Sequence, residues 1–214
     1  MKQEDALLPE ICPAPAKQRK KATREEIAIE FTRKSIHLLI AFVPFLLSLS
    51  KPLTIALLLA GTAVYAIFEQ LRMKGIKIPI VSMLTARATR LRDDGHFVTG
   101  PVTLGLGALI SVMVFDPISA SIAVYILAFG DGFSSLVGKT VGRISLPLTR
   151  GKSVEGSLTC FVFSLISAFL VSGQLRAALI IAAVSTLVEA APTKDWDNIL
   201  LPLSAGVTAT LLGL

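Results

Sequence analysis

Charge lies along this 214-residue chain in short clusters that are separated by long apolar stretches. Only 17% of the residues are Asp, Glu, Lys or Arg, whereas 53% are hydrophobic. A soluble domain of this length spreads charge over its whole surface, because water surrounds it on every side. A bilayer core about 30 Å thick instead requires helices of roughly 17–25 apolar residues. The pattern therefore predicts an all-α, polytopic transmembrane helical bundle.

Seven apolar segments predict about seven membrane spans. They are residues 36–49, 53–68, 98–115, 118–129, 158–171, 177–191 and 199–214. Several of these segments are short for a full span, so we expect tilted or broken helices or a locally thinner bilayer.

The positions of Lys and Arg predict how the bundle is oriented. If the N-terminus lies inside, nineteen of the 21 basic residues fall in inner segments, and only Lys51 and Arg176 lie outside. Basic residues accumulate in cytoplasmic loops, so this split favours an N-terminus inside. The net charge of +6 then belongs to a cytoplasmic face, which attracts anionic lipid headgroups and nucleotides. Nucleic acid is a poor partner, because no soluble basic domain carries the charge.

The N-terminal residues 1–29 differ from the rest of the chain. Three prolines and a run of Lys and Arg predict a disordered basic cytoplasmic tail, followed by one transmembrane domain over residues 30–214. The basic cluster is expected to anchor the topology, with binding of anionic lipid as the alternative. The predicted location is the cytoplasmic membrane of a prokaryote, with the functional site facing the cytoplasm.

The densest polar cluster follows the fourth apolar segment. At about 100° per residue on a helix, four of its residues fall within a sector of about 60°. These are Asp131, Ser135, Gly138 and Gly142, with Lys139 at one edge and Arg143 beyond it. Glycine lets a ligand approach the backbone, an acid can hold Mg²⁺, and cations can hold phosphate oxygens. The alternative, a close helix-packing face, does not explain why an acid and two cations share the stretch.

The second polar cluster precedes the fifth apolar segment. A P-loop is excluded there, because Leu146 occupies the position where that motif requires glycine. Ser153 is expected to cap the next helix, whose free N–H groups favour an anion, and Arg150 and Lys152 add positive charge. Glu155 in the first turn can bind a metal. An ordinary capped helix start is an equally good interpretation.

The remaining candidates lie on the same predicted side of the membrane. Glu189 ends an apolar helix, where an ionisable group is costly and usually functional, whereas Asp197 and Asn198 open the last segment. Others flank the first three segments: Arg33, Lys34, His37, Glu69, Arg72 and Thr99. Ordinary structural roles are the alternatives, namely a helix cap for Asn198 and an ion pair between Glu69 and Arg72. Their convergence on one side is the stronger signal.

These clusters resemble the family of dolichol kinases, phytol kinases and CTP-dependent diacylglycerol kinases. The resemblance covers about residues 30–203. It rests on Gly130-Asp-Gly132, on Gly138-Lys-x-x-Gly-Arg143 and on Lys152-Ser-x-Glu-Gly-Ser157. Supporting matches are Arg33-Lys34 with His37, Glu69-x-x-Arg72, Thr99-Gly-Pro101 and Asp197-Asn198. The resemblance implies transfer of the γ-phosphate of CTP to a lipid alcohol, with Mg²⁺ or another divalent cation. The acceptor would be a polyprenol, phytol or similar isoprenoid alcohol, or diacylglycerol.

The clusters and the resemblance together give each candidate an expected role. The catalytic residues are Asp131, Lys152 and Glu155, where Asp131 is either a metal ligand or the acceptor of the hydroxyl proton. The metal ligands are Asp131, Glu155 and Asp197. The nucleotide-binding residues are Gly130, Gly132, Ser135, Gly138, Lys139, Gly142, Arg143, Arg150, Ser153, Gly156 and Ser157.

Two other functions stay open at this point. A CTP:phosphatidate cytidylyltransferase uses the same nucleotide but releases pyrophosphate, and the longer C-terminal signature expected of that family is absent. A small transporter would place its charges near the middle of helices, whereas here the charges lie at the predicted inner ends. The sequence selects neither the acceptor alcohol nor the oligomeric state.

Overall fold

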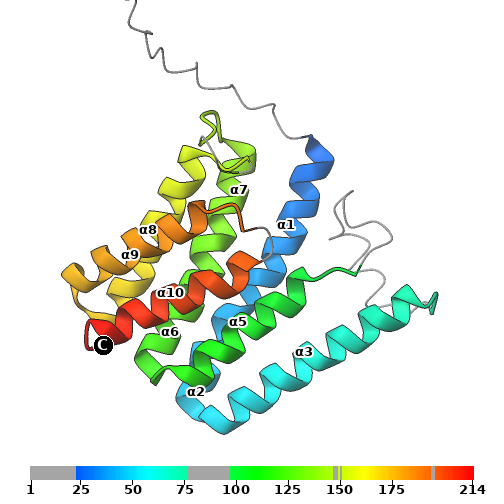
Figure 1. The fold of residues 1–214 in the computed structure, drawn as a ribbon, viewed down its shortest axis with the longest axis horizontal. Coiled ribbons are helices and arrows are strands. Elements are labelled where there is room, and N and C mark those ends of the chain that lie inside the picture. The colour runs from blue at the N-terminus through cyan, green and yellow to red at the C-terminus, as the bar shows by residue number, and fades with distance from the viewer. Residues whose placement is uncertain (1–22, 77–96, 147–148, 150, 194–195) are drawn as a thin grey trace, which may run out of the picture.

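The described residues form a bundle of seven helical rods (Figure 1). The structure is a computed structural model, and it describes residues 23–76, 97–146, 149, 151–193 and 196–214. The first rod comprises α1 (Arg24–Leu39), η1 (Ile40–Phe42) and α2 (Val43–Leu49), and the second is α3 (Lys51–Met73). The third is α5 (Gly100–Val114), and the fourth comprises α6 (Pro117–Tyr125), the π-helical turn η3 (Ile126–Asp131) and α7 (Gly132–Thr140). The last three are α8 (Val154–Ser172), α9 (Leu175–Ala190) and α10 (Asp197–Leu211). The predicted all-α fold is confirmed.

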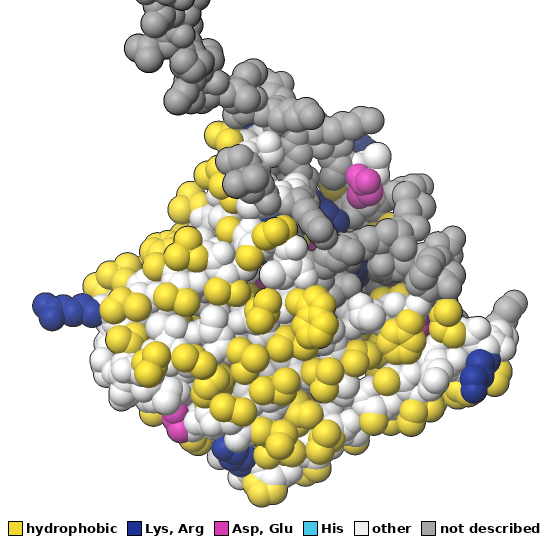
Figure 2. Space-filling model, in the orientation of Figure 1, with side chains coloured by type: hydrophobic (Ala, Val, Ile, Leu, Met, Phe, Trp, Pro, Cys, Tyr) yellow, Lys and Arg dark blue, Asp and Glu magenta, His cyan; other side chains and the backbone are white. Residues whose placement is uncertain are grey.

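The outer surface of this bundle is suited to lipid as its solvent. Four helical stretches are long and apolar enough to cross a membrane: Glu26–Leu49, Lys51–Met73, Pro117–Thr140 and Val154–Ser172. Large aliphatic side chains such as Leu170, Leu187 and Leu211 are more than 70% exposed. Figure 2 shows hydrophobic side chains spread across the described surface in that view, with few charged ones among them. A water-soluble monomer rarely exposes so large an apolar area, so the predicted polytopic membrane bundle is confirmed.

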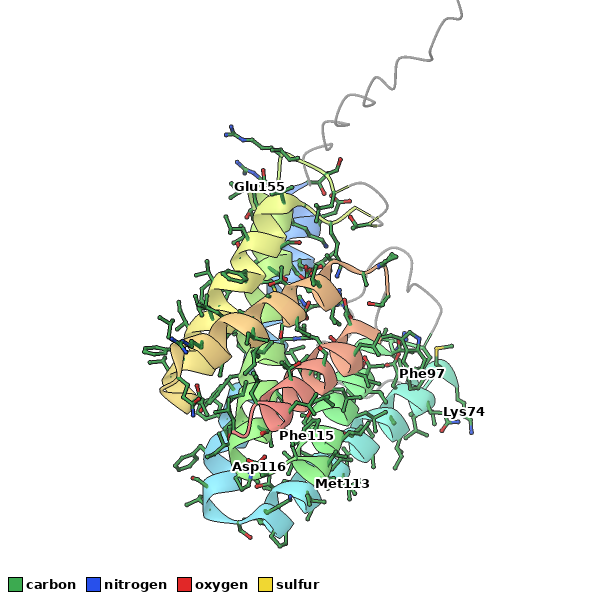
Figure 3. The ribbon with its side chains drawn as sticks, turned by 60° about the vertical axis from the view of Figure 1, so that its left-hand side comes forward. Lys74, Phe97, Met113, Phe115, Asp116 and Glu155 are labelled. Carbon is green, nitrogen blue, oxygen red and sulfur yellow. The ribbon has the colours of Figure 1, made fainter. Side chains whose placement is uncertain are left out.

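The rods alternate in direction, so the bundle has two ends. One end, called the polar end below, holds the starts of α1, α5, α8 and α10 and the ends of α3, α7 and α9. Glu155 lies there, whereas Asp116 lies at the opposite end (Figure 3). Helices α5, α9 and α10 have 15, 16 and 15 residues. At 1.5 Å per residue they are about 22–24 Å long, and α1, α7 and α8 extend beyond them at the polar end.

The fourth rod is the centre of the bundle. It packs against α1, α2, α5, α8 and α10. Asp116 caps α6 by accepting hydrogen bonds from two backbone N–H groups, and Pro117 occupies the first turn. From Ile122 to Ala128 every residue except Tyr125 is fully buried. A helix that is apolar all round belongs in the interior, and this one is surrounded by its neighbours.

Small residues allow neighbouring helices to approach closely. A Cβ at Gly107 of α5 would collide with the backbone oxygen of Asn198 in α10, and one at Gly206 would collide with the ring of Phe115. At Gly130 it would lie 2.9 Å from Ser164 Oγ of α8. Van der Waals contact between small residues is a main source of helix association in membranes.

The structure differs from the sequence prediction at two boundaries. The fourth segment does not end at residue 129, because η3 and α7 continue the rod to Thr140. Gly130 and Gly132 look like a helix end in the sequence, yet here Gly130 serves the close contact with α8. The first helix begins at Arg24, inside the segment predicted as a tail, where Thr23 and Glu26 form a capping box. Residues 1–22 lie outside the described part.

Candidate active site

Asp131 is the centre of the first buried polar cluster. It is the last residue of the π-helical turn, and it is only 2% exposed. Lys34 Nζ donates a 2.5 Å hydrogen bond to Asp131 Oδ2, and His37 Nδ1 lies 3.4 Å from the same oxygen. Ser135 Oγ, one turn along α7, donates to Oδ1 at 3.5 Å. Single π-turns within α-helices occur frequently at functional sites.

One face of α1 supplies the partners of the fourth rod. Glu30, Lys34 and His37 follow a spacing of four and three residues, so they share a helix face. Glu30 is fully buried, and its Oε2 lies 2.5 Å from Lys139 Nζ and 3.5 Å from Arg33 Nη1. Buried charges persist only when they are paired, and each carboxylate here has a cation. In the sequence Glu30 stands with Lys34 and His37 at the start of the first apolar segment, but no site role was predicted for it, although its spacing from these two residues could have indicated one.

A second buried cluster joins α8, α9 and α10. Lys152, two residues before α8, donates to the backbone oxygen of Glu189, and its Nζ lies 3.2 Å from Glu189 Oε1. Ser157 Oγ donates to Glu189 Oε2 at 3.2 Å. Asp197 Oδ2 lies 4.0 Å from Lys152 Nζ. The structure therefore brings together four predicted residues, which we call the Glu189 cluster: Lys152, Ser157, Glu189 and Asp197.

The two clusters are neighbours at the polar end. Helix α8, which begins two residues after Lys152, packs against η3 and α7, the elements on either side of the Asp131 carboxylate. Asn198 connects α10 to α5 by donating to Thr103 Oγ1 at 2.9 Å and to the backbone oxygen of Gly100 at 3.3 Å. A Cβ at Gly100 would lie 3.4 Å from Arg33 Nη2, so α1 also lies close to the start of α5, where Asn198 donates. Asn198 thus bridges two helices and is not a helix cap.

Several predicted site residues have structural contacts. Glu155 Oε1 accepts hydrogen bonds from the backbone N–H groups of Arg143 and Ile144, at 2.9 and 3.3 Å. Arg143 itself is exposed. Ser153 caps α8 by accepting from Gly156 N at 3.2 Å, so the predicted cap is confirmed. Arg150 lies outside the described residues.

Two of the glycines that were predicted to bind nucleotide, Gly142 and Gly156, make close contacts within the protein. A Cβ at Gly156 would lie 2.9 Å from the backbone oxygen of Ser134, and one at Gly142 would collide with the backbone oxygen of Gly138. Gly132 has ordinary space, with Leu38 Cδ2 at 3.7 Å from the added carbon. The close contacts of Gly142 and Gly156 account for both glycines without a ligand.

Glu69, Arg72 and Thr99 lie at the junction of α3 and α5. Arg72 makes two hydrogen bonds to Glu69, at 2.6 and 2.9 Å, and Val98 N donates to Glu69 Oε1 at 2.9 Å. The carboxylate therefore ties the end of α3 to the segment before α5. Thr99 precedes α5 without a side-chain hydrogen bond to cap it.

The three predicted metal ligands do not form a metal site in the described part of the chain. No group of three or more His, Cys, Asp and Glu side chains there is placed to hold a metal. Asp131 is bound to Lys34, Asp197 lies beside Lys152, and Glu155 holds backbone N–H groups. We therefore assign no catalytic step to a metal held by these residues.

Comparison with curated proteins finds phytol kinases and a dolichol kinase as homologues. The chain is 32% identical over 136 residues to probable phytol kinase 2, chloroplastic, of Glycine max, covering 53% of this chain and 45% of the relative. It is 29% identical over 161 residues to phytol kinase 1, chloroplastic, of Arabidopsis thaliana, covering 66% and 53%. It is 25% identical over 203 residues to dolichol kinase sec59 of Schizosaccharomyces pombe, covering 85% and 39%. These homologues confirm the resemblance that the motifs indicated.

The extent of these matches is limited. The chain spans about half the length of most of the curated relatives it matches. No family model matches the chain, and no solved structure matches it.

Proposed function

We propose that this chain, whose homologues are phytol and dolichol kinases, phosphorylates a membrane lipid alcohol with CTP as the donor. The observation that carries the proposal is the buried set of paired charges around Asp131 at the polar end of a membrane bundle. The hydroxyl of a lipid alcohol lies at the membrane surface while its chain stays in the hydrocarbon. A polar end is where such a hydroxyl can meet a water-soluble nucleotide.

Three lysines supply the positive charge that a triphosphate needs. In the structure Lys34, Lys139 and Lys152 each pair with a carboxylate, of Asp131, Glu30 and Glu189 respectively. An entering triphosphate would exchange these carboxylates for phosphate oxygens, which make charge-assisted hydrogen bonds of similar kind. Phosphoryl transfer depends mainly on such positioning and charge stabilisation. We propose that the divalent cation arrives bound to the triphosphate.

The proposed reaction is a direct transfer between the two substrates. The alcohol oxygen attacks the γ-phosphorus, and the bond from that phosphorus to the bridging oxygen of the β-phosphate breaks. CDP leaves with the bonding electrons, and the hydroxyl proton passes to a carboxylate. Asp131 is the proposed acceptor, because His37 and Ser135 still hold its side chain when Lys34 turns to the triphosphate. We place this reaction on the cytoplasmic side, from the distribution of Lys and Arg.

Product analysis tests this proposal. The purified chain in detergent is given labelled CTP, ATP, GTP or UTP with phytol, a polyprenol or diacylglycerol, and the Asp131→Asn protein serves as the control for contaminating kinases. We expect CDP and a lipid monophosphate in equal amounts, with CTP preferred. Pyrophosphate together with a CMP-bearing lipid would instead identify a cytidylyltransferase. No turnover with any pair would contradict an enzymatic function.

A further inference from the structure

An apolar groove opens between α9 and α10. The two helices lie side by side (Figure 1). The groove between them is lined almost wholly by carbon. Val188 of α9 lies on one wall and Leu200, Ser204 and Val207 of α10 lie on the other. From Leu200 to Val207 the groove follows about 10 Å of α10. Leu200 and Val207 are 41% and 47% exposed, so the groove is open to the surrounding lipid.

The groove reaches a polar group at the end nearest the Glu189 cluster. Thr193, in the turn between α9 and α10, lines it, and its Oγ1 is buried without a hydrogen-bond partner among the described residues. A buried hydroxyl without a partner costs free energy, so a ligand that hydrogen-bonds to it is favoured. Glu189 and Asp197 stand on either side of this turn in the sequence, and both lie beside Lys152. An apolar channel thus leads to an unpaired hydroxyl next to a charged cluster.

We infer that this groove binds the hydrocarbon chain of the lipid alcohol, with the hydroxyl end toward Thr193 and Lys152. The inference rests on the proposed function and adds to it a binding path for the acceptor. The charges at the groove end favour a neutral headgroup, because Lys152 already faces the two carboxylates of Glu189 and Asp197. A phospholipid would bring an anionic phosphate toward these carboxylates without the divalent cation that we propose accompanies the triphosphate, so the carboxylates would repel it. A slender chain with a small neutral polar end fits the groove and its charges.

Photolabelling tests the groove without requiring turnover. An isoprenoid alcohol that carries a diazirine on its chain is mixed with the protein in phosphatidylcholine vesicles, irradiated, and located by peptide mass spectrometry. We expect labels on α9 and α10, competed by unlabelled phytol. Val207→Trp fills the groove and should lower that labelling roughly ten-fold. Leu211→Trp is the matched control on the same helix, because Leu211 is 81% exposed and does not line the groove.

Thr193→Val tests the hydroxyl end. Valine keeps the shape of threonine and removes the oxygen, so phytol should compete several-fold less well, while the corresponding alkane should compete as before. Labels on other helices, or labelling unchanged by Val207→Trp, would overturn the proposed binding of the lipid chain in the groove, even if the protein makes lipid phosphate. Equal loss of competition by phytol and alkane would overturn the placing of the hydroxyl. Absence of turnover with every alcohol would overturn the proposed function, whatever the labelling pattern.

Discussion

Asp131 has the contacts expected of a residue that is fixed before the substrates bind. Lys34, His37 and Ser135 hold both of its oxygens, and the side chain is almost fully buried. If it accepts the hydroxyl proton, Asp131→Asn should lower kcat by at least about a hundred-fold, the contribution typical of acid–base catalysis. Labelled CTP with phytol measures the rate, and Arg176→Ala, at the opposite end of the bundle, is an exposed-residue control. Retention of half the activity would move the role elsewhere, with Glu189 as the next carboxylate.

The pairing of Lys34 with Asp131 gives a separate prediction about stability. Lys34→Met leaves a buried carboxylate without its principal cation, which should cost about 3 kcal/mol. The double variant Lys34→Met/Asp131→Asn removes both charges and should recover most of that loss while staying inactive. Thermal unfolding in detergent measures each variant, and Lys74→Met is the exposed control. A double variant as unstable as Lys34→Met alone would show that the ion pair is not the cause.

The individual site residues could be chosen from the sequence, but their partners could not. Charges beside long apolar segments are rare, so the sequence alone identified four of these residues as candidates: Lys34, His37, Asp131 and Glu189. Lys34 and Asp131 are 97 residues apart, and no local pattern indicates that they meet. Gly156 shows the opposite case, because a motif suggested a ligand site where the structure shows helix contact.

At the scale of elements, hydrophobicity predicted all seven rods but not every end. Each predicted apolar segment overlaps one rod, because lipid-facing and buried helices both require apolar residues. The error lies at the fourth rod, where the apolar segment was predicted to end at residue 129, before the glycines beside Asp131. In this bundle the π-turn carries the helix past them, and the gain from close contact with α8 offsets the poor helix propensity of glycine. The consequence is functional, because Asp131 lies inside a rod and not at its end.

Two glycines provide a matched test of helix packing. Gly107 faces the backbone of α10, so Gly107→Ala should force α5 and α10 apart and cost about 1–3 kcal/mol. Gly61 on α3 has no neighbour within 4 Å of an added Cβ. Gly61→Ala should therefore raise helix stability by roughly 0.5–1 kcal/mol. Thermal unfolding in detergent compares the two, and a stable Gly107→Ala protein would contradict the close approach of the helices.

The two ends of the bundle differ along the direction of the helix axes. The buried ion pairs of Asp131, Glu30 and Glu189 all lie toward the polar end. At the opposite end, Asp116 caps α6 and Lys51 donates to the backbone oxygen of Phe115. Helix α3 contributes mainly an exposed apolar face, whereas the fourth rod is enclosed. This asymmetry suits the proposed lipid kinase, whose two substrates would approach from different phases.

The orientation of this asymmetric bundle is open to a direct test. Basic residues stay on the cytoplasmic side, so the polar end should be inside. With Cys12 and Cys160 replaced, single cysteines are introduced by Lys74→Cys and Arg143→Cys at the polar end and by Arg176→Cys at the opposite end, all at exposed positions. In intact bacterial cells an impermeant maleimide should label Arg176→Cys alone, and the other two only after permeabilisation. The reverse pattern would invert the bundle and place the Asp131 cluster away from cytoplasmic nucleotide. Labelling of Lys74→Cys and Arg143→Cys from different sides would contradict the alternation of the rods itself.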